Sequence, residues 1–162
     1  MTTTITSSEL SDVLSQARDY GAEHGLPYAG AVSPKQAWQL ASSGAATIVD
    51  VRSRFEHEFV GRVPGSQLLE WRIYAGNAEG GVTSRPNPDF LRQLQQLHQP
   101  DAPLLLLCRS AVRSHNAAIA AAEAGYTNVY NILEGFEGDK DENGRRGSLG
   151  GWRKAGLPWN QG

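Results

Sequence analysis

Two short apolar runs constrain the fold of this chain more than any other feature. Residues 46–51 form a β-branched run without regular polar alternation, and residues 104–107 are four consecutive leucines. Strands that are apolar on both faces are typical of a parallel sheet that helices cover on each side. We therefore predict that both runs are central strands of such a sheet.

Helices and further strands are expected around these two runs. Ser33 followed by Pro34 is typical of a helix start, and Gly44 and Gly125 are typical of helix ends. The spacing of apolar residues predicts helices at residues 6–20, 35–43, 88–97 and 117–124, and further strands at residues 28–32 and 127–132. This alternation of strands and helices indicates an α/β fold with a parallel sheet.

The length of 162 residues fits one domain with a short extension. The first helix is expected to begin with a capping box at Thr6 and to end near Gly21, before Pro27. We therefore predict an N-terminal helical extension at residues 1–27 and a main domain at residues 28–162.

Charge and cysteine content exclude several classes of protein. Fifteen Lys and Arg residues stand against seventeen Asp and Glu residues, a net charge of −2, so we do not expect nucleic acid as a partner. The single cysteine excludes an internal disulfide framework and cysteine-rich zinc or iron–sulfur sites. Neither a signal peptide nor a long apolar stretch is present, so we expect a cytoplasmic protein without a membrane partner.

The one cysteine stands where parallel sheets bind their ligands. Cys108 directly follows the leucine strand, and the chain is expected to turn into a helix within about five residues. Such a turn presents successive backbone N–H groups and the positive end of a helix to an anion. Arg109 and Arg113 add positive charge, so we expect Cys108 to be a nucleophile at neutral pH. An inert, buried structural cysteine is the alternative.

Asp50 and Arg52 end the neighbouring strand and are expected at the same edge of the sheet. Their side chains could orient the loop arginines or a bound donor. They could equally form an ion pair that only braces the edge of the sheet. We therefore take them as supporting residues and leave both roles open.

Four segments of the chain resemble, in order, the motifs of the rhodanese-type sulfurtransferases. They are residues 48–52 (Ile-Val-Asp-Val-Arg), residues 58–66 (the Pro-Gly turn), residues 108–114 (Cys-Arg-Ser-Ala-Val-Arg-Ser, usually C-R-S-G-x-R-S), and residues 133–135 with Trp152 and residues 155–158. The resemblance covers about residues 30–160. It implies a rhodanese-like three-layer α/β/α fold with a central, mainly parallel sheet.

This resemblance also implies a sulfurtransferase that works in two steps. Cys108 would attack the outer sulfur of a donor such as thiosulfate and form a persulfide, which then passes its sulfur to an acceptor. The acceptor would be cyanide or a cellular thiol, on a small molecule or on a sulfur-accepting protein. The loop that would bind the anionic donor comprises Arg109, Ser110, Ala111, Val112 and Arg113. The resemblance implies no metal and no organic cofactor.

The chain departs from the family pattern at three places. Ala111 stands where glycine is usual, and because a Cβ disfavours positive φ, we expect the loop to adopt a conformation that an L-residue tolerates. Arg62 replaces the histidine of the Pro-Gly turn. A loop at about residues 138–150 is inserted, and its residues 139–144 begin like a calcium-binding loop. Because Gly150 stands where that motif needs a bidentate glutamate, we expect a solvated loop without calcium.

A cysteine in such a loop could serve three functions other than sulfur transfer. Phosphatases of similar type use Cys-x5-Arg, whereas only four residues separate Cys108 from Arg113, so the loop is expected to be too small for phosphate. A cysteine hydrolase would need a histidine base, and all four histidines are expected to be solvated. A catalytically silent binding or regulatory module usually lacks the loop cysteine, and this chain retains it.

Overall fold

A sheet of five parallel strands forms the centre of the computed structural model, which describes residues 5–162. Its order is β1 (Gly30–Val32), β7 (Val129–Ile132), β6 (Leu104–Leu107), β2 (Thr47–Asp50) and β3 (Gln67–Leu68). The leucine run, β6, pairs with β2 on one side and β7 on the other. The two runs that we predicted as central strands therefore lie side by side in the middle of the sheet.

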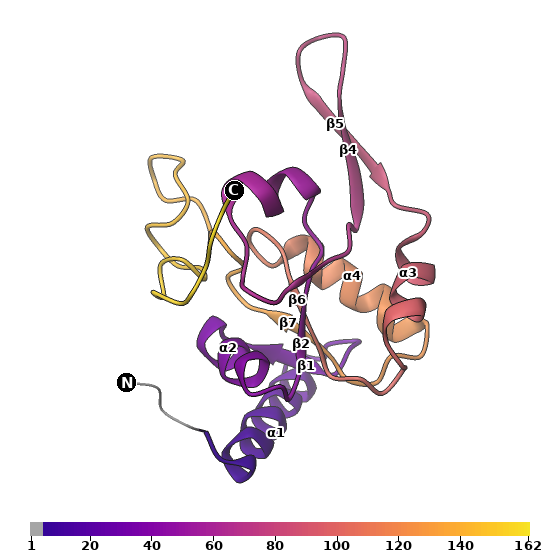
Figure 1. Cartoon of the computed structure of the whole chain (residues 1–162), viewed down its shortest axis with the longest axis vertical. Coiled ribbons are helices and arrows are strands. Elements are labelled where there is room, and N and C mark those ends of the chain that lie inside the picture. The colour runs from indigo at the N-terminus through magenta and orange to yellow at the C-terminus, as the bar shows by residue number, and fades with distance from the viewer. Residues whose placement is uncertain (1–4) are drawn as a thin grey trace.

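Helices cover both faces of this sheet (Figure 1). They are α1 (Ser7–Glu23) and α2 (Pro34–Ser42) on one face, and α3 (Phe90–Leu97) and α4 (Val112–Glu123) on the other. Leu104 and Leu106 belong to the core under α3 and α4, whereas Leu105 and Leu107 belong to the core under α1 and α2. All four leucines are fully buried. The predicted three-layer α/β/α fold with a parallel sheet is confirmed.

Helix α1 lies directly against strand β1. It continues through Gly21 to Glu23, past the predicted end. A Cβ atom at Gly21 would lie 2.3 Å from the carbonyl oxygen of Ala29, so at this position only glycine allows the helix to approach the strand. Ala17 of this helix is part of the core on that face. The division of the chain after residue 27 stays a prediction.

A two-stranded antiparallel hairpin projects from the body of the molecule (Figure 1). It consists of β4 (Arg72–Gly76) and β5 (Val82–Pro86), and the sequence did not lead us to predict it. Every residue of β5 is exposed, so the alternation of buried and exposed residues that marks most strands is missing. The hairpin begins at the edge of the sheet and carries Tyr74 on its inner half.

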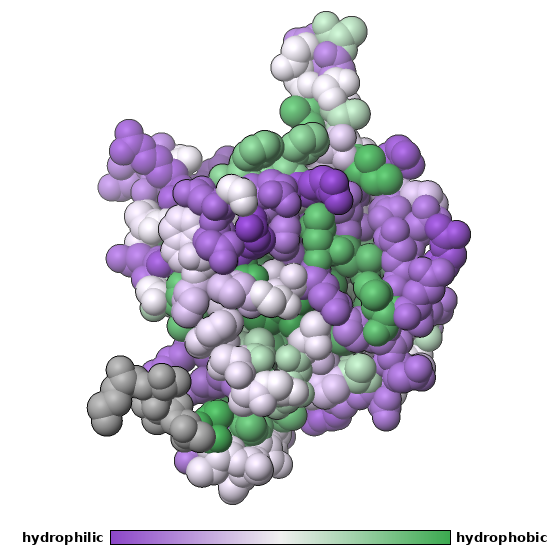
Figure 2. Space-filling model, in the orientation of Figure 1, coloured by the Kyte–Doolittle hydropathy of each residue, from purple (hydrophilic) through white to green (hydrophobic). Residues whose placement is uncertain are grey.

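The inserted loop at residues 138–150 contains no helix or strand. The Asp141 carboxylate organises it by accepting hydrogen bonds from the backbone N–H groups of Asn143 and Arg145 and from the Ser148 hydroxyl. Figure 2 shows this part of the surface, at the upper left of the body, as hydrophilic. Within residues 5–162 no group of acidic, histidine or cysteine side chains is placed to hold a metal ion. In the same range, no helix combines the length and apolar character that a membrane crossing needs.

We predict that Gly30→Ala destabilises the protein by roughly 1–3 kcal/mol, because the new Cβ would force α1 away from β1. That Cβ would lie 1.9 Å from the carbonyl oxygen of Ala17. The free energy of unfolding in urea measures the effect. Gly76→Ala in the hairpin is the control, since its Cβ would meet no atom closer than 3.9 Å. Equal stabilities of the two variants would contradict this packing.

Candidate active site

Cys108 lies at the floor of a pocket of about 390 Å³, at the carboxyl edge of the sheet. Its side chain is almost fully buried, with 1% of the residue exposed, yet it forms part of the pocket lining. The Phe136 N–H donates a 2.8 Å hydrogen bond to the carbonyl oxygen of Cys108 and fixes the start of the loop. The backbone of Cys108 is therefore held in place, and its side chain borders this pocket.

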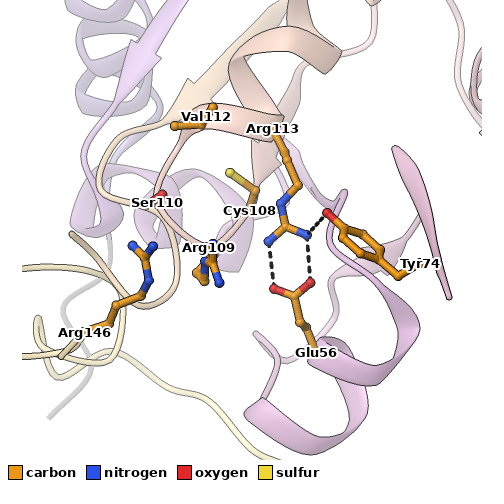
Figure 3. A pocket seen from close by; sticks show the side chains of 8 residues that line it. All are labelled: Glu56, Tyr74, Cys108, Arg109, Ser110, Val112, Arg113 and Arg146. Atoms are coloured by element: carbon orange, nitrogen blue, oxygen red, sulfur yellow. Dashed lines mark hydrogen bonds and ion pairs between the residues drawn. The ribbon is translucent and has the colours of Figure 1, made fainter. Parts of the chain in front are cut away.

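The loop from Cys108 to the start of α4 curves around the cysteine side chain (Figure 3). The backbone N–H groups of residues 109–113 have no hydrogen-bond acceptor within residues 5–162. They lie at the N-terminal end of α4, where the helix dipole also favours negative charge. The loop thus keeps several backbone N–H donors without a protein acceptor at the start of α4.

Ala111 overturns our expectation for this loop. We expected its Cβ to exclude positive φ, but Ala111 adopts the left-handed conformation, with φ 75° and ψ 2°. This conformation costs an L-residue about 1–2 kcal/mol. It is held because the carbonyl oxygen of Ala111 accepts hydrogen bonds from the Asn131 side chain and from the N–H of His115. The loop therefore keeps the turn that glycine usually makes, at some cost in strain.

A buried pair of polar side chains supports Cys108 from the side of α4. The Ser114 hydroxyl lies 3.2 Å from the Cys108 sulfur and 2.5 Å from the Asn131 carbonyl oxygen, to which it donates. Both residues are buried, with no exposed surface on Ser114 and 4% of Asn131 exposed. A hydroxyl carries only one proton, so Ser114 accepts from the thiol in this arrangement and can donate to an ionised sulfur only by turning away from Asn131.

Arg113 reaches the pocket wall but is paired there. Its two terminal nitrogens donate to the two carboxylate oxygens of Glu56, each at 2.7 Å, and one of them also contacts the Tyr74 hydroxyl at 3.1 Å. Burial raises the pKa of Glu56, but the hydrogen bonds and charge of Arg113 outweigh it and hold that pKa below its usual value. Burial alone would lower the pKa of Arg113. The hydrogen bonds and negative charge of Glu56 outweigh this effect and raise that pKa above its usual value. The pair closes one wall of the pocket.

Asp50 and Arg52 are fully buried and are absent from the pocket lining. The Arg52 guanidinium donates two hydrogen bonds to the Asp50 carboxylate, at 2.9 and 2.7 Å, and a third to the carbonyl oxygen of Gly61. It also stacks over the Phe136 ring, 4.5 Å from the centroid. Burial raises the pKa of Asp50, but hydrogen bonds from His57 and Arg52 outweigh it and lower that pKa. The charges of Asp50 and Arg52 are thus satisfied within the protein, and neither side chain reaches the pocket.

The segment that carries Glu56 is a one-turn π-helix, η1 (Glu56–Val60). His57 on the same turn places Nδ1 2.8 Å from the Asp50 carboxylate, so η1 is tied to the buried ion pair. Short π-helices often occur at functional sites, where they aim a side chain that a regular turn would misplace. Here η1 aims Glu56 at Arg113.

The sequence interpretation missed three side chains that line the pocket, Glu56, Tyr74 and Arg146. Glu56 and Tyr74 come from elements that carry no clear sequence signal, a π-helix and an exposed hairpin. Arg146 comes from the inserted loop, and its guanidinium donates to the carbonyl oxygen of Gly138 at 2.8 Å. Arg109 lines the same pocket and is exposed.

Three of the four histidines differ from our expectation that they are solvated, whereas His24 is exposed as expected. His57 contacts the buried Asp50, the Nδ1 of His115 lies 2.6 Å from the Tyr28 hydroxyl, and His98 contacts the Gln67 side chain. Each of these three histidines contacts a side-chain partner, because the fold partly buries the position at which the histidine stands. Since the pocket lining contains no histidine, the geometry does not place a base for hydrolysis beside Cys108.

We predict that Glu56→Gln lowers the free energy of unfolding by about 2 kcal/mol at pH 7, because Arg113 loses its charged partner. The lowered pKa of Glu56 means that its contribution is full above its unfolded pKa, about 4.3, and is lost as the pH falls through the folded pKa. The difference between wild type and variant should therefore shrink below about pH 4. Denaturation in urea across this pH range measures it.

Glu58→Gln is the matched control for that experiment. Glu58 lies on the same turn, is half exposed, and approaches Arg62 only to 3.9 Å. We expect it to change stability little at any pH. If Glu56→Gln behaved like this control, the pairing of Glu56 with Arg113 would be unimportant for the pocket wall.

Comparison with known proteins places this site in a family. The model of the rhodanese-like domain matches residues 33–142. Thiosulfate sulfurtransferase GlpE of Haemophilus influenzae is 29% identical over 107 residues, which cover 66% of this chain and 84% of that protein. The uncharacterized protein RC0915 of Rickettsia conorii is 32% identical over 128 residues, covering 74% of this chain and 87% of its own length.

Solved structures agree with this assignment. Rv0390 from M. tuberculosis is 41% identical, with a TM-score of 0.68, over 83% of this chain and 99% of its own. The polysulfide-sulfur transferase homodimer of Wolinella succinogenes is 19% identical, with a TM-score of 0.54, over 94% of this chain and 89% of that one, and shares the fold. With its family-model match, its parallel sheet and its cysteine loop, the chain belongs to the family of rhodanese-like domains.

Proposed function

We propose that this protein is a sulfurtransferase that takes a sulfane sulfur from thiosulfate and carries it as a Cys108 persulfide. The observation that carries the proposal is the position of Cys108, on the floor of an arginine-lined pocket at the start of a loop with free N–H donors. The similarity to GlpE sulfurtransferases supports the same reaction class. A silent module would have no need of a thiol in this setting.

In the first step the Cys108 thiolate attacks the outer sulfur of thiosulfate. A new sulfur–sulfur bond forms at Cys108, the bond within thiosulfate breaks, and its electron pair leaves with sulfite. The enzyme retains a persulfide with one negative charge, so no proton transfer to a base is required. The free N–H groups of residues 109–113 would stabilise that charge, as donors fixed in place do for other anionic intermediates.

In the second step an acceptor removes the outer sulfur and regenerates the thiolate. With cyanide the product is thiocyanate, and with a thiolate acceptor it is a new persulfide. The acceptor in the cell would be a thiol on a small molecule or on a sulfur-accepting protein. Both steps use the same pocket, because within residues 5–162 Cys108 is the sole cysteine and its sulfur borders this space.

The two loop arginines take different roles in this proposal. Arg109 is exposed and would attract and orient the anionic donor. Arg113 is committed to Glu56, so its main task would be to hold the pocket wall, with its charge largely neutralised there. Asp50 and Arg52 would act only by bracing the edge of the sheet under the loop.

Phosphatase chemistry finds less support in this geometry. Enzymes of that type surround phosphate with a longer loop whose arginine binds the phosphate oxygens in a bidentate manner. Arg113 stands at the corresponding end of the loop in this protein. Both of its terminal nitrogens already donate hydrogen bonds to the Glu56 carboxylate. A phosphate would have to displace a partly buried carboxylate from its ion pair.

We predict that wild-type protein incubated with thiosulfate gains the mass of one sulfur atom at Cys108, and that cyanide then removes it. Cys108→Ser should show neither the gain in mass nor thiocyanate formation, because a serine hydroxyl is not ionised at neutral pH and forms no persulfide. Intact-mass spectrometry and a thiocyanate assay measure the two steps. The circular dichroism spectrum of the variant should match that of the wild type.

Two outcomes would contradict the proposal. One is a wild-type protein that never gains sulfur from thiosulfate. The other is a Cys108→Ser variant that still produces thiocyanate at the wild-type rate. Hydrolysis of p-nitrophenyl phosphate by the wild type, lost in Cys108→Ser, would favour the phosphatase alternative instead.

A further inference from the structure

We propose that Arg146, in the inserted loop, pairs with Arg109 to form a subsite for the sulfonate group of the donor, and that this subsite selects donors with two negative charges. This inference rests on the proposed sulfurtransferase function and specifies its donor. Arg146 lies beyond residues 33–142, which match the family model, so it is a feature that the family assignment does not supply.

The pocket contains three arginines in different electrostatic states. Arg113 is neutralised by Glu56 through two hydrogen bonds of 2.7 Å. Neither Arg109 nor Arg146 has an acidic partner within 4.0 Å in residues 5–162. Figure 3 shows these two guanidinium groups on the side of the pocket opposite to the Glu56–Arg113 pair. The pocket therefore has one neutral wall and one wall with two positive charges.

Arg146 is held in place by the structure of its own loop. Its guanidinium donates to the Gly138 carbonyl oxygen at 2.8 Å, across the base of the loop. That base is tight, because a Cβ at Gly138 would lie 2.4 Å from the carbonyl oxygen of Gly150. The hydrogen bonds to Asp141 fix the rest of the loop. A guanidinium held in this way loses little conformational entropy when it binds an anion.

The chemistry of the donor explains why two charges are useful on this wall. Thiosulfate carries two negative charges, and as its sulfur–sulfur bond breaks, the electron pair moves to the departing sulfite. Arginine forks donate to sulfonate oxygens in pairs, as they do to carboxylates and phosphates. Arg109 and Arg146 would thus bind the donor and stabilise the leaving group. They would have no such task in the second step, when no sulfonate is present.

The test compares Arg146 with its neighbour Arg145. Arg145 is exposed, its side chain does not line the pocket, and it occupies the same loop. The variants are Arg146→Gln, which keeps an N–H donor for Gly138, Arg146→Lys, which keeps the charge, and Arg145→Gln as the matched control. Each is assayed with thiosulfate and with methanethiosulfonate, a sulfane donor of one negative charge.

We expect Arg146→Gln to raise the KM for thiosulfate about tenfold, the effect of losing one charged hydrogen bond. The KM for methanethiosulfonate should rise less, and the rate at which cyanide removes sulfur from the preformed persulfide should not change. Arg146→Lys should recover part of the loss, and Arg145→Gln should resemble the wild type. This difference between donors would not arise if Arg146 only supported the loop.

Three results would overturn the subsite. They are a KM for thiosulfate that is equal in Arg146→Gln and Arg145→Gln, an equal loss with both donors, or a slower cyanide step. In all three cases the wild type still transfers sulfur, so the proposed function survives. A wild type that gains sulfur from neither donor would overturn the function and the subsite together.

Discussion

The structure of this site depends on one constraint, the short passage from a fully buried strand to a helix. Strand β6 ends at Leu107 and α4 begins at Val112, so only four residues connect two elements of the core. A connection this short cannot form regular hydrogen bonds, and the N–H groups of residues 109–113 are left without acceptors. Unused backbone donors are costly inside a protein unless something binds them. The passage therefore sets the position of Cys108 and leaves the backbone donors that the proposed function assigns to an anion.

The chain that follows β7 holds this passage from the other side. The N–H groups of Glu137 and Gly138 donate to the carbonyl oxygen of Arg109, and Phe136 donates to that of Cys108. Gly135 lies so close that a Cβ there would be 2.5 Å from the carbonyl carbon of Arg109. The carbonyl groups of the loop are thus bound from outside, which leaves its N–H groups as the free side. The same contacts place the start of the inserted loop beside the pocket.

How much of this could be predicted from the sequence depends on the range of the interactions. The central strands follow from the apolar runs, since burial on both faces determines their composition, and Cys108 follows from its place after Leu107. Helix α4 begins at Val112, within the five residues after Cys108 in which we expected a helix to start. The apolar spacing marked this helix only from residue 117, because Arg113, Ser114 and His115 in its first turn are polar. The left-handed Ala111 could not be predicted, because the contact that holds it comes from Asn131 on another strand.

The pocket wall was harder to predict for the same reason. Glu56 and Arg113 are far apart in the sequence. Glu56 alone indicates only a charged, solvated position, and Arg113 alone indicates a charge that faces an anion. The pair forms because η1 is anchored to the buried Asp50 through His57, a link that requires the complete fold. The contacts of Asp50 and Arg52 likewise require the complete fold, because both side chains are buried and absent from the pocket lining. Motif residues indicate where the chemistry lies, whereas long-range contacts decide which of their charges are free.

The balance of charge then links both steps of the proposed reaction. Glu56 cancels Arg113, so the net positive charge of the pocket comes from Arg109 and Arg146. With Cys108 ionised as proposed, one unit of positive charge remains to attract a donor. Thiosulfate brings two negative charges and sulfite removes two, so the persulfide form has the same net charge as the resting form. The transfer of sulfur therefore leaves the net charge of the pocket unchanged between the two steps. Under the proposed function, a third unpaired arginine would bind sulfite more tightly and slow its release, so the pairing of Arg113 with Glu56 would favour turnover as well as structure.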